Sequence, residues 1–291
     1  MKPAPFDYAA PRTLEEAVAL LAEHGDEAKV IAGGQSLVPL LAFRLAAPGL
    51  LVDLNRVPEL AGLRLEGDTL VAGAITRHRD VESLPGLTER CAMLADGVSV
   101  IGHVAIRNRG TVGGSVAHAD PAAEWPSLLL ALDGEVEARG PAGTRTIAAA
   151  DLFETYFTTT LRPDEILTQV RLRLPNGRVG SAYLELARRH GDFAIAGAGA
   201  LLRLDGGGRI DDARVVLIGV ADRAVRSNAA EGVLRGAEPG PEAFAEAAEA
   251  IDGEIDPVSD LHGSAEYRRI VATVLVRRAL ARALERVRRE A

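Results

Sequence analysis

The sequence predicts an α+β protein of two domains that meet near residue 176. Of its 291 residues, 47% are hydrophobic, enough to fill one large core or two ordinary ones. Pro175-Asn176-Gly177 is the clearest turn signal, and it follows the alternating strand-like run ILTQVRLRLP at 166–175. Beyond it, strand-like segments precede helical ones, which is the order of an α+β domain.

The first elements follow from spacing and turn chemistry. Thr13 and Glu16 have capping-box spacing before an apolar face, which predicts a helix over 14–24. The run KVIA at 29–32 is a short strand; a polar glycine turn at 33–36 and an apolar helix over 37–41 follow.

Residues 51–54 form a further predicted strand, and 63–74 a hairpin that turns at Gly67-Asp68. Thr76 is expected to cap a short helix that ends at Val81. The segment 107–126 is too glycine-rich for an ordinary helix and too apolar for a disordered linker. An apolar run at 127–132 and a strand at 135–139 come next.

The second unit begins with three strand-like runs at 183–189, 194–204 and 213–220, followed by helical patterns at 242–251 and 265–289. In the last helix six apolar residues are expected to face the core, and the arginines between them to face solvent. These apolar residues are Ile270, Val271, Val274, Leu275, Leu280 and Leu284.

Composition excludes several classes of function. A formal charge of −8 gives no general attraction for nucleic acid or acidic membranes, and the single cysteine, Cys91, excludes an internal disulfide or a cluster held by several thiolates. No apolar run reaches the roughly 20 residues of a membrane span and the start lacks a signal pattern, so we expect a cytoplasmic protein. The histidines have no metal-ligand spacing and no nucleophile motif is present, so we predict neither a metal site nor a catalytic residue.

Two glycine turns, at 32–37 and 110–117, are the candidate binding segments. Backbone without Cβ atoms lets successive N–H groups approach and donate to phosphate oxygens. The sequence AGGQSL matches neither the Rossmann fingerprint nor the Walker loop. Each turn alone is more often structural, and residue chemistry does not name a ligand.

The segments KVIAGGQSLVPLL, IRNRGTVGGSVAHADPAAEWP, TLRPDEIL and ARRHGDFAIAG resemble, in order and spacing, the FAD-binding medium subunits of the xanthine dehydrogenase and carbon monoxide dehydrogenase family of molybdenum hydroxylases. The resemblance spans almost the whole chain. It implies a FAD-binding domain of the vanillyl-alcohol-oxidase type at 1–176, with subdomains at about 1–56 and 57–176. A smaller C-terminal domain at 177–291 would carry three antiparallel strands and a helical bundle.

The resemblance also assigns cofactor-binding residues by matching position. The first segment would wrap the FAD pyrophosphate and the second would form a second cradle. The first comprises Val30, Ile31, Ala32, Gly33, Gly34, Gln35, Ser36 and Leu37, and the second Gly110, Thr111, Gly113, Gly114, Ser115 and Ala117.

Further contacts are implied outside these two segments. Ile101 and Gly102 would lie along the cofactor, and Glu124, where relatives often carry aspartate, would reach the adenosine side. Thr160 and Leu161 would approach the adenine or the ring system, and Asp192 and Phe193 the isoalloxazine. Phe193 either shields the ring or packs in a core, and Trp125 either packs in a core or stacks on a nucleotide. Where many relatives have a lysine near the flavin this chain has Glu185, so the basic group that faces the flavin is left open.

The function that the resemblance implies is electron relay. A large molybdenum subunit would oxidise the substrate, a small iron–sulfur subunit would pass electrons on, and FAD in this chain would deliver them to an external acceptor, in a dimer of heterotrimers. The substrate pocket would lie on another polypeptide. Two alternatives are a stand-alone FAD-dependent oxidoreductase of the same fold, and a binding or assembly protein that has lost FAD.

Overall fold

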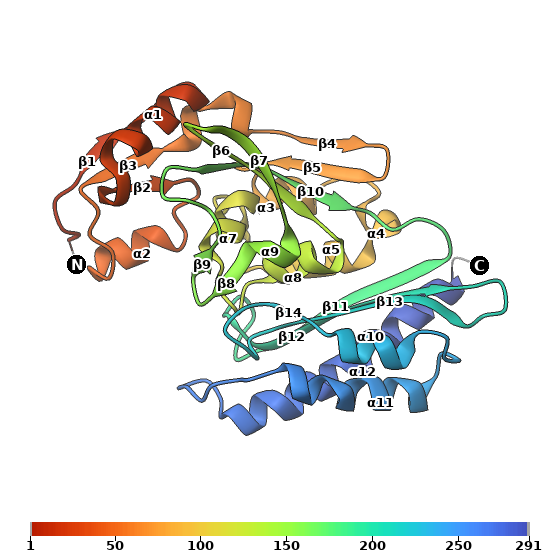
Figure 1. Cartoon of the computed structure of the whole chain (residues 1–291). Helices are drawn as coiled ribbons and strands as arrows, with labels where there is room; N and C mark the ends of the chain where they lie inside the picture. Colours follow the sequence, from red (N-terminus) through yellow and green to blue (C-terminus); the bar gives the residue numbers. More distant parts are fainter. Residues whose placement is uncertain (1, 290–291) are drawn as a thin grey trace.

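The computed structural model describes residues 2–289, and its N-terminal part is a small parallel sheet (Figure 1). The sheet has the order β1-β3-β2, with β1 Asp7–Ala9, β3 Leu50–Asp53 and β2 Ala28–Ile31. Helix α1, Leu14–His24, packs on it, and the Thr13 hydroxyl accepts the Glu16 N–H at 3.2 Å, which confirms the predicted cap. Helix α2, Leu37–Ala42, follows the polar turn as expected.

A second sheet of five strands lies beside the first, in the order β4-β5-β10-β6-β7 with antiparallel neighbours. Its strands are β4 Leu63–Glu66, β5 Thr69–Gly73, β6 Glu135–Gly140, β7 Gly143–Ala148 and β10 Ile166–Arg173. The predicted hairpin is confirmed, since β4 and β5 pair across Gly67, whose φ is 61°. A glycine accepts this left-handed conformation without steric cost.

Short helices fill the space beneath this sheet (Figure 1). They are α3 His78–Glu82, α4 Leu87–Arg90, α5 Ala92–Val100, α6 Val104–Arg107, α7 Val112–His118, α8 Glu124–Ala131 and α9 Ala149–Leu152. A two-stranded hairpin, β8 Phe153–Thr155 with β9 Thr158–Thr159, follows α9. Single 3₁₀ turns occupy Gly25–Glu27, Leu54–Arg56, Pro58–Leu60 and Ile251–Glu254.

Two expectations for this layer were wrong. The helix expected from Thr76 begins at His78, because the Thr76 hydroxyl instead donates to the Gly62 carbonyl at 2.7 Å. The segment judged too glycine-rich for a helix contains α7. Thr111 caps this helix by accepting the Gly114 N–H at 3.1 Å, and a Cβ at Gly113 would lie 2.7 Å from Ala74. Tertiary contact therefore outweighs the low helix propensity of glycine here.

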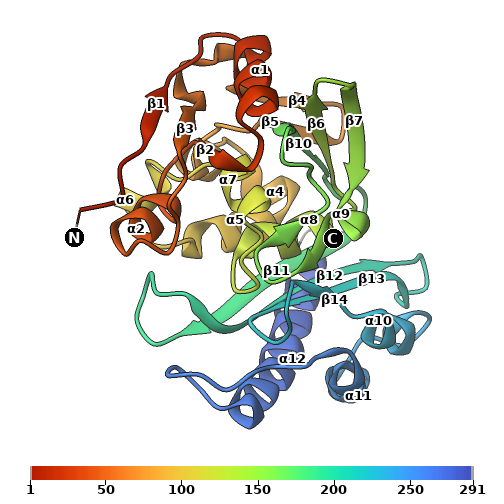
Figure 2. The same ribbon diagram turned by 60° about the vertical axis from the view of Figure 1, so that its left-hand side comes forward.

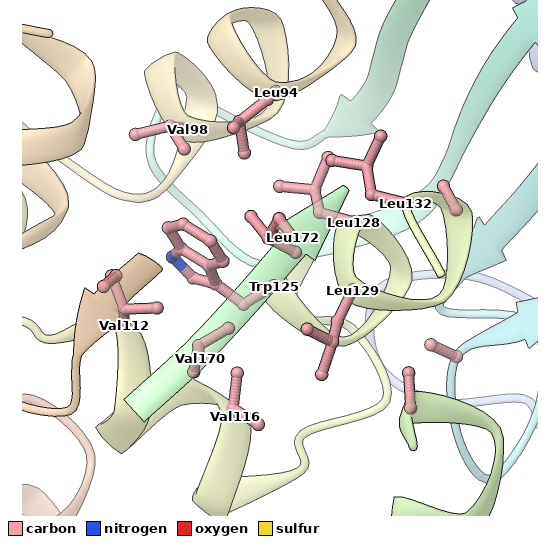
Figure 3. Packing of buried hydrophobic residues seen from close by; sticks show 14 of the residues in the cluster. Leu94, Val98, Val112, Val116, Trp125, Leu128, Leu129, Leu132, Val170 and Leu172 are labelled. Atoms are coloured by element: carbon pink, nitrogen blue, oxygen red, sulfur yellow. The ribbon is translucent and has the colours of Figure 1, made fainter. Parts of the chain in front are cut away.

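Trp125 is the centre of the core between the five-stranded sheet and these helices (Figure 3). Its side chain is 0% exposed and contacts apolar residues of the sheet and of the helical layer. Leu94, Val98, Val112, Val116, Leu128, Leu129, Leu132, Val170 and Leu172 surround it (Figure 3). The core interpretation of Trp125 is therefore correct, and stacking on a nucleotide is not available to it.

The C-terminal part adds an antiparallel sheet in the order β11-β12-β13-β14 and a helical layer on its outer face (Figures 1 and 2). The strands are β11 Val179–Ala187, β12 Ala194–Leu204, β13 Ile210–Ile218 and the two-residue β14 Val225–Arg226. The helices are α10 Asn228–Leu234, α11 Pro241–Ala250 and α12 Ala265–Arg289. The three expected strands are present, and β14 is a fourth.

Small residues let α12 approach this sheet closely. A Cβ on Gly180 would lie 2.1 Å from the Ala283 carbonyl oxygen, so the helix backbone packs directly on β11. Four residues of the predicted apolar face of α12 are buried: Val271, Leu275, Leu280 and Leu284. Ile270 is 57% exposed, so the expected core face was wrong at that residue, whereas Arg277 and Arg278, between the apolar residues, are exposed as expected.

Candidate functional site

The structure brings the two glycine segments into direct backbone contact. Gly33, between β2 and α2, is buried, and a Cβ there would lie 2.4 Å from the carbonyl oxygen of Arg109 and 2.8 Å from Cα of Gly110. A Cβ on Gly114 would lie 3.9 Å from Cβ of Ala32. The two segments are thus neighbours in space, although more than 70 residues of chain lie between them.

The first segment presents a row of free backbone donors. Within residues 2–289, the N–H groups of Gly33, Gly34, Gln35 and Ser36 donate to no protein acceptor. Gly34 has φ 73° and the Gln35 side-chain amide donates to the Gly33 carbonyl at 2.9 Å, so the turn is held in a defined shape. Successive free N–H groups in such a turn suit an anion, and they fit a pyrophosphate.

The second segment is different, because most of its donors are already used. Gly110 donates to Ile106 at 2.7 Å, Gly113 to Ala74 at 3.0 Å, and Gly114 and Ser115 to Thr111. The glycines of this segment therefore allow close packing. The segment forms the beginning of α7 and does not present a second row of free N–H groups. Ser115 is half-buried and Ala117 exposed along the same helix.

Two residues that the sequence did not single out join these segments. Asn55 Nδ2 donates to the Ala32 carbonyl at 2.8 Å, and Arg77 Nη2 donates to Asn55 Oδ1 at 2.6 Å. Arg77 Nη1 donates to the carbonyl of Arg109. Burial, and then the charge of Arg109, lowers the pKa of Arg77, so the Arg109 charge lies close enough to act on it.

Val30, Ile31 and Leu37 flank the first turn. Val30 and Ile31 are half-buried residues of β2, and Leu37 is the first residue of α2. They shape the ends of the turn that carries the free donors.

The loop between β11 and β12 reaches the segment that precedes α6. A Cβ on Gly191 would lie 2.3 Å from the His103 ring, and the rings of His103 and His190 have centroids 6.2 Å apart. Ile101 is buried and Gly102 has φ 49°, so this segment turns beneath the loop. Asp192 and Phe193 lie in the same loop and are exposed, Phe193 by 69%. Core packing is therefore the wrong interpretation of Phe193, and shielding of the ring remains a prediction.

Thr160 and Leu161 follow the β8–β9 hairpin, which packs on α7. The Thr160 hydroxyl donates to the Asp151 carbonyl at 3.0 Å and its own carbonyl accepts from Arg145 at 2.7 Å. Leu161 packs against the core of the first domain. On the same hairpin Phe157 lies 5.1 Å from His118, ring to ring.

Glu124 and Glu185 are two partly buried acidic residues, and the charge of Glu185 acts on Glu124. Burial, followed by the charges of Glu185 and Asp120, raises the pKa of Glu124 to about 8. Burial alone raises the pKa of Glu185 to about 7, and one of its carboxyl oxygens, Oε2, is buried without a partner. The Tyr183 hydroxyl shares a hydrogen bond with the Ser127 hydroxyl at 3.0 Å. Both glutamates were singled out from the sequence, but the effect of one charge on the other is seen only in the structure.

Comparison with known proteins identifies related proteins along nearly the whole chain. Residues 4–176 match the model of the FAD binding domain in molybdopterin dehydrogenase, and residues 181–283 match the CO dehydrogenase flavoprotein C-terminal domain. The chain is 45% identical to the 6-hydroxypseudooxynicotine dehydrogenase complex subunit alpha of Paenarthrobacter nicotinovorans, across 99% of this chain and 97% of that one.

Solved structures agree. Carbon monoxide dehydrogenase from Hydrogenophaga pseudoflava superposes with a TM-score of 0.95 at 40% identity, covering 98% of this chain and 99% of that chain. Quinoline 2-oxidoreductase from Pseudomonas putida 86 gives 0.92 at 37% identity, covering 98% and 99%. No helix within the described residues is both long and apolar enough to cross a bilayer. The chain therefore belongs to the family of FAD-binding medium subunits of molybdenum hydroxylases, an oxidoreductase family to which the carbon monoxide dehydrogenase medium chains also belong.

Proposed function

We propose that this chain holds FAD with its pyrophosphate on the turn at 33–36 and carries electrons between partner subunits and an external acceptor. The observation that carries the proposal is the row of four free N–H groups beside the close backbone contact at Gly33 and Gly110. A Cβ on Gly33 would clash with the backbone of Arg109 and Gly110, and a Cβ on Gly110 with His78, so both glycines are needed to bring the second segment against the turn that carries the free donors.

The remaining proposed contacts extend from this point in two directions. Ile101, Gly102, Asp192 and Phe193 would meet the isoalloxazine end, and Thr160, Leu161 and Glu124 would lie beyond the pyrophosphate. Val30, Ile31, Ala32, Leu37, Thr111, Gly113, Gly114, Ser115 and Ala117 would complete the walls around the pyrophosphate. The proposed binding domain is 1–176, and 177–291 supplies the loop at 188–193.

When bound, FAD supplies the electron chemistry, because flavin takes up electrons singly and releases them singly or in pairs. The residues of this chain bind it, orient it and limit the access of water. In this role the chain needs no catalytic acid or base. We place the molybdenum site on a large partner subunit and the iron–sulfur clusters on a small one, in a dimer of heterotrimers, and the complex in the cytoplasm.

The test is a titration of the purified chain with FAD, followed by removal of excess cofactor, a visible spectrum and a melting curve. At a FAD concentration of about 100 times Kd, binding should add roughly 2.7 kcal/mol to the free energy of unfolding. A retained flavin spectrum with a raised melting temperature is expected. Absence of both, also in the presence of the molybdenum and iron–sulfur subunits, would favour a protein that assembles with partners but has lost FAD.

Association then separates relay from a stand-alone oxidoreductase. A complex isolated from the native source through this chain should contain molybdenum and iron, and its flavin should be reduced by substrate of the large subunit. Steady turnover by the isolated FAD-loaded chain with a substrate of its own would instead support the stand-alone oxidoreductase.

A further inference from the structure

Asn55 and Arg77 occupy the seam between the two glycine segments. Asn55 follows β3 of the first sheet, and Arg77 precedes α3 in the second part of the domain. Each belongs to a different half of the domain, and their side chains meet through the 2.6 Å bond between Arg77 Nη2 and Asn55 Oδ1. Through this bond the two side chains link the two halves of the domain.

The acceptors of this chain of contacts are the two carbonyls that immediately precede the critical glycines. Asn55 holds the carbonyl of Ala32, one residue before Gly33. Arg77 holds the carbonyl of Arg109, one residue before Gly110. That same Arg109 oxygen is the atom that a Cβ on Gly33 would meet at 2.4 Å, so one carbonyl touches both the turn and the guanidinium.

The backbone around Arg77 reinforces the arrangement. Arg77 and Thr111 form an isolated antiparallel bridge, with His78 N–H donating to the Gly110 carbonyl at 3.1 Å and Val112 N–H to the Thr76 carbonyl at 2.9 Å. Asn55 is itself fixed, since its N–H donates to Asp53 Oδ1 at 2.9 Å. The backbone from which each side chain reaches across the seam is therefore fixed by hydrogen bonds.

We infer that Asn55 and Arg77 are positioning residues that set the spacing and orientation of the two glycine segments, and so determine how tightly this chain holds a diphosphate-bearing cofactor. This Asn55–Arg77 bracket acts through the carbonyls of Ala32 and Arg109 and leaves the N–H groups of residues 33–36 free for the ligand. The inference rests on the proposed FAD site.

The geometry needs arginine and not only a positive charge. One guanidinium donates through Nη1 to Arg109 and through Nη2 to Asn55, and a lysine ammonium on its longer, flexible stem cannot reproduce this planar fork. Loss of the fork removes the side-chain donor of the Arg109 carbonyl and that of Asn55 Oδ1, and with them the link between the two segments.

The experiment compares Arg77→Met, Arg77→Lys and Asn55→Ala with the control Arg79→Met in the full chain. Arg79 is on α3, is exposed, and pairs with Glu82, so its replacement removes an equal charge without touching the Asn55–Arg77 contact. FAD dissociation constants come from flavin fluorescence, and hydrogen exchange of the FAD-free protein reports on the amides of Val38, Leu40, Gly113 and Gly114. These amides donate within or beside the two segments.

Arg77→Met is expected to weaken FAD binding roughly 10- to 100-fold and to speed exchange in both segments. Arg77→Lys should recover only part of that affinity. Asn55→Ala should speed exchange at Val38 and Leu40 more than at Gly113, because Asn55 holds only the first segment. Arg79→Met should stay within about threefold of the parent.

Three results would overturn the bracket: full affinity in Arg77→Lys, equal losses in Arg77→Met and Arg79→Met, or unchanged exchange at Val38 in Asn55→Ala. Exchange that rises uniformly along the chain would also count against it, since that reports general destabilisation. If the parent binds no FAD, the proposed function fails while the exchange comparison still decides whether the bracket exists.

Discussion

Trp125 donates its indole N–H to Nδ1 of His78 at 2.9 Å inside the core of the first domain. The other edge of the same imidazole touches the second glycine segment, since a Cβ on Gly110 would lie 2.7 Å from Nε2. His78 thus connects the largest buried side chain to the wall of the proposed cofactor site. Because Nδ1 accepts a hydrogen bond, the ring in this arrangement is neutral.

Replacement of Trp125 by phenylalanine keeps most of the packing and removes the donor. Nδ1 of His78 would then be buried without a partner, which costs about 1–3 kcal/mol. Urea unfolding at pH 7 should show that loss in the free energy of unfolding. An unchanged free energy would mean that water or another donor replaces the indole.

His78 also predicts weakening of the fold in acid. Burial, followed by the charges of Arg107 and Arg77, lowers its pKa from the ordinary histidine value of 6.5 to about 4. The contribution of neutral His78 to the free energy of unfolding is complete above pH 6.5. It is lost as the pH falls towards 4, because the unfolded chain binds the proton more readily than the folded one. His78→Asn should reduce this slope of stability against pH, whereas His24→Asn, at an exposed position, should keep it.

Glu185 predicts the opposite trend. Burial raises the pKa of Glu185 to about 7. The contribution of its protonated carboxyl to the free energy of unfolding is therefore complete below about pH 4.5 and is lost as the pH rises through 7. Glu185→Gln should be more stable than the parent at pH 8 and equal to it at pH 4.5, measured by unfolding of the FAD-free chain. The exposed Glu249→Gln is the control; the same gain there would show that net charge alone is responsible.

Replacement of Gly34 or Gly114 by valine is expected to abolish FAD binding for steric reasons. Gly34→Val would force a branched residue to φ 73°, and Gly114→Val would place Cβ 2.6 Å from Thr111 Oγ1. Both should abolish flavin retention after gel filtration, while Gly206→Val, whose Cβ meets nothing within 4 Å, should retain it. Parent-like retention in either cradle variant would remove that residue from the proposed site.

Local signals predicted much of this fold, and contacts between distant segments account for the misses. The cap at Thr13 and the turn at Gly67 depend on residues a few positions apart, so spacing alone located them. Helix α7 was missed because Gly113 is required by its close contact with Ala74, which is distant in sequence.

The candidate site divides in the same way. The turn at 33–36 was recognised from its residue types, but Arg77 contacts Asn55 and Arg109 across 22 and 32 positions, and no local pattern marks such a pair. The effect of the Glu185 charge on Glu124 likewise appears only once the two domains are packed.

The core that surrounds Trp125 does not stop where the chain passes from one domain to the next. Tyr183, Leu201 and Val216 of the C-terminal sheet belong to the same apolar cluster, and Arg286 of α12 bonds Asp96 of α5 at 2.6 Å. Expressing residues 1–176 and 177–291 separately would therefore expose apolar surface on each fragment. Proteolytic cleavage at the exposed Asn176–Gly177 link would leave the two fragments associated through this shared core. The two matched sequence regions should therefore be expressed together as one chain.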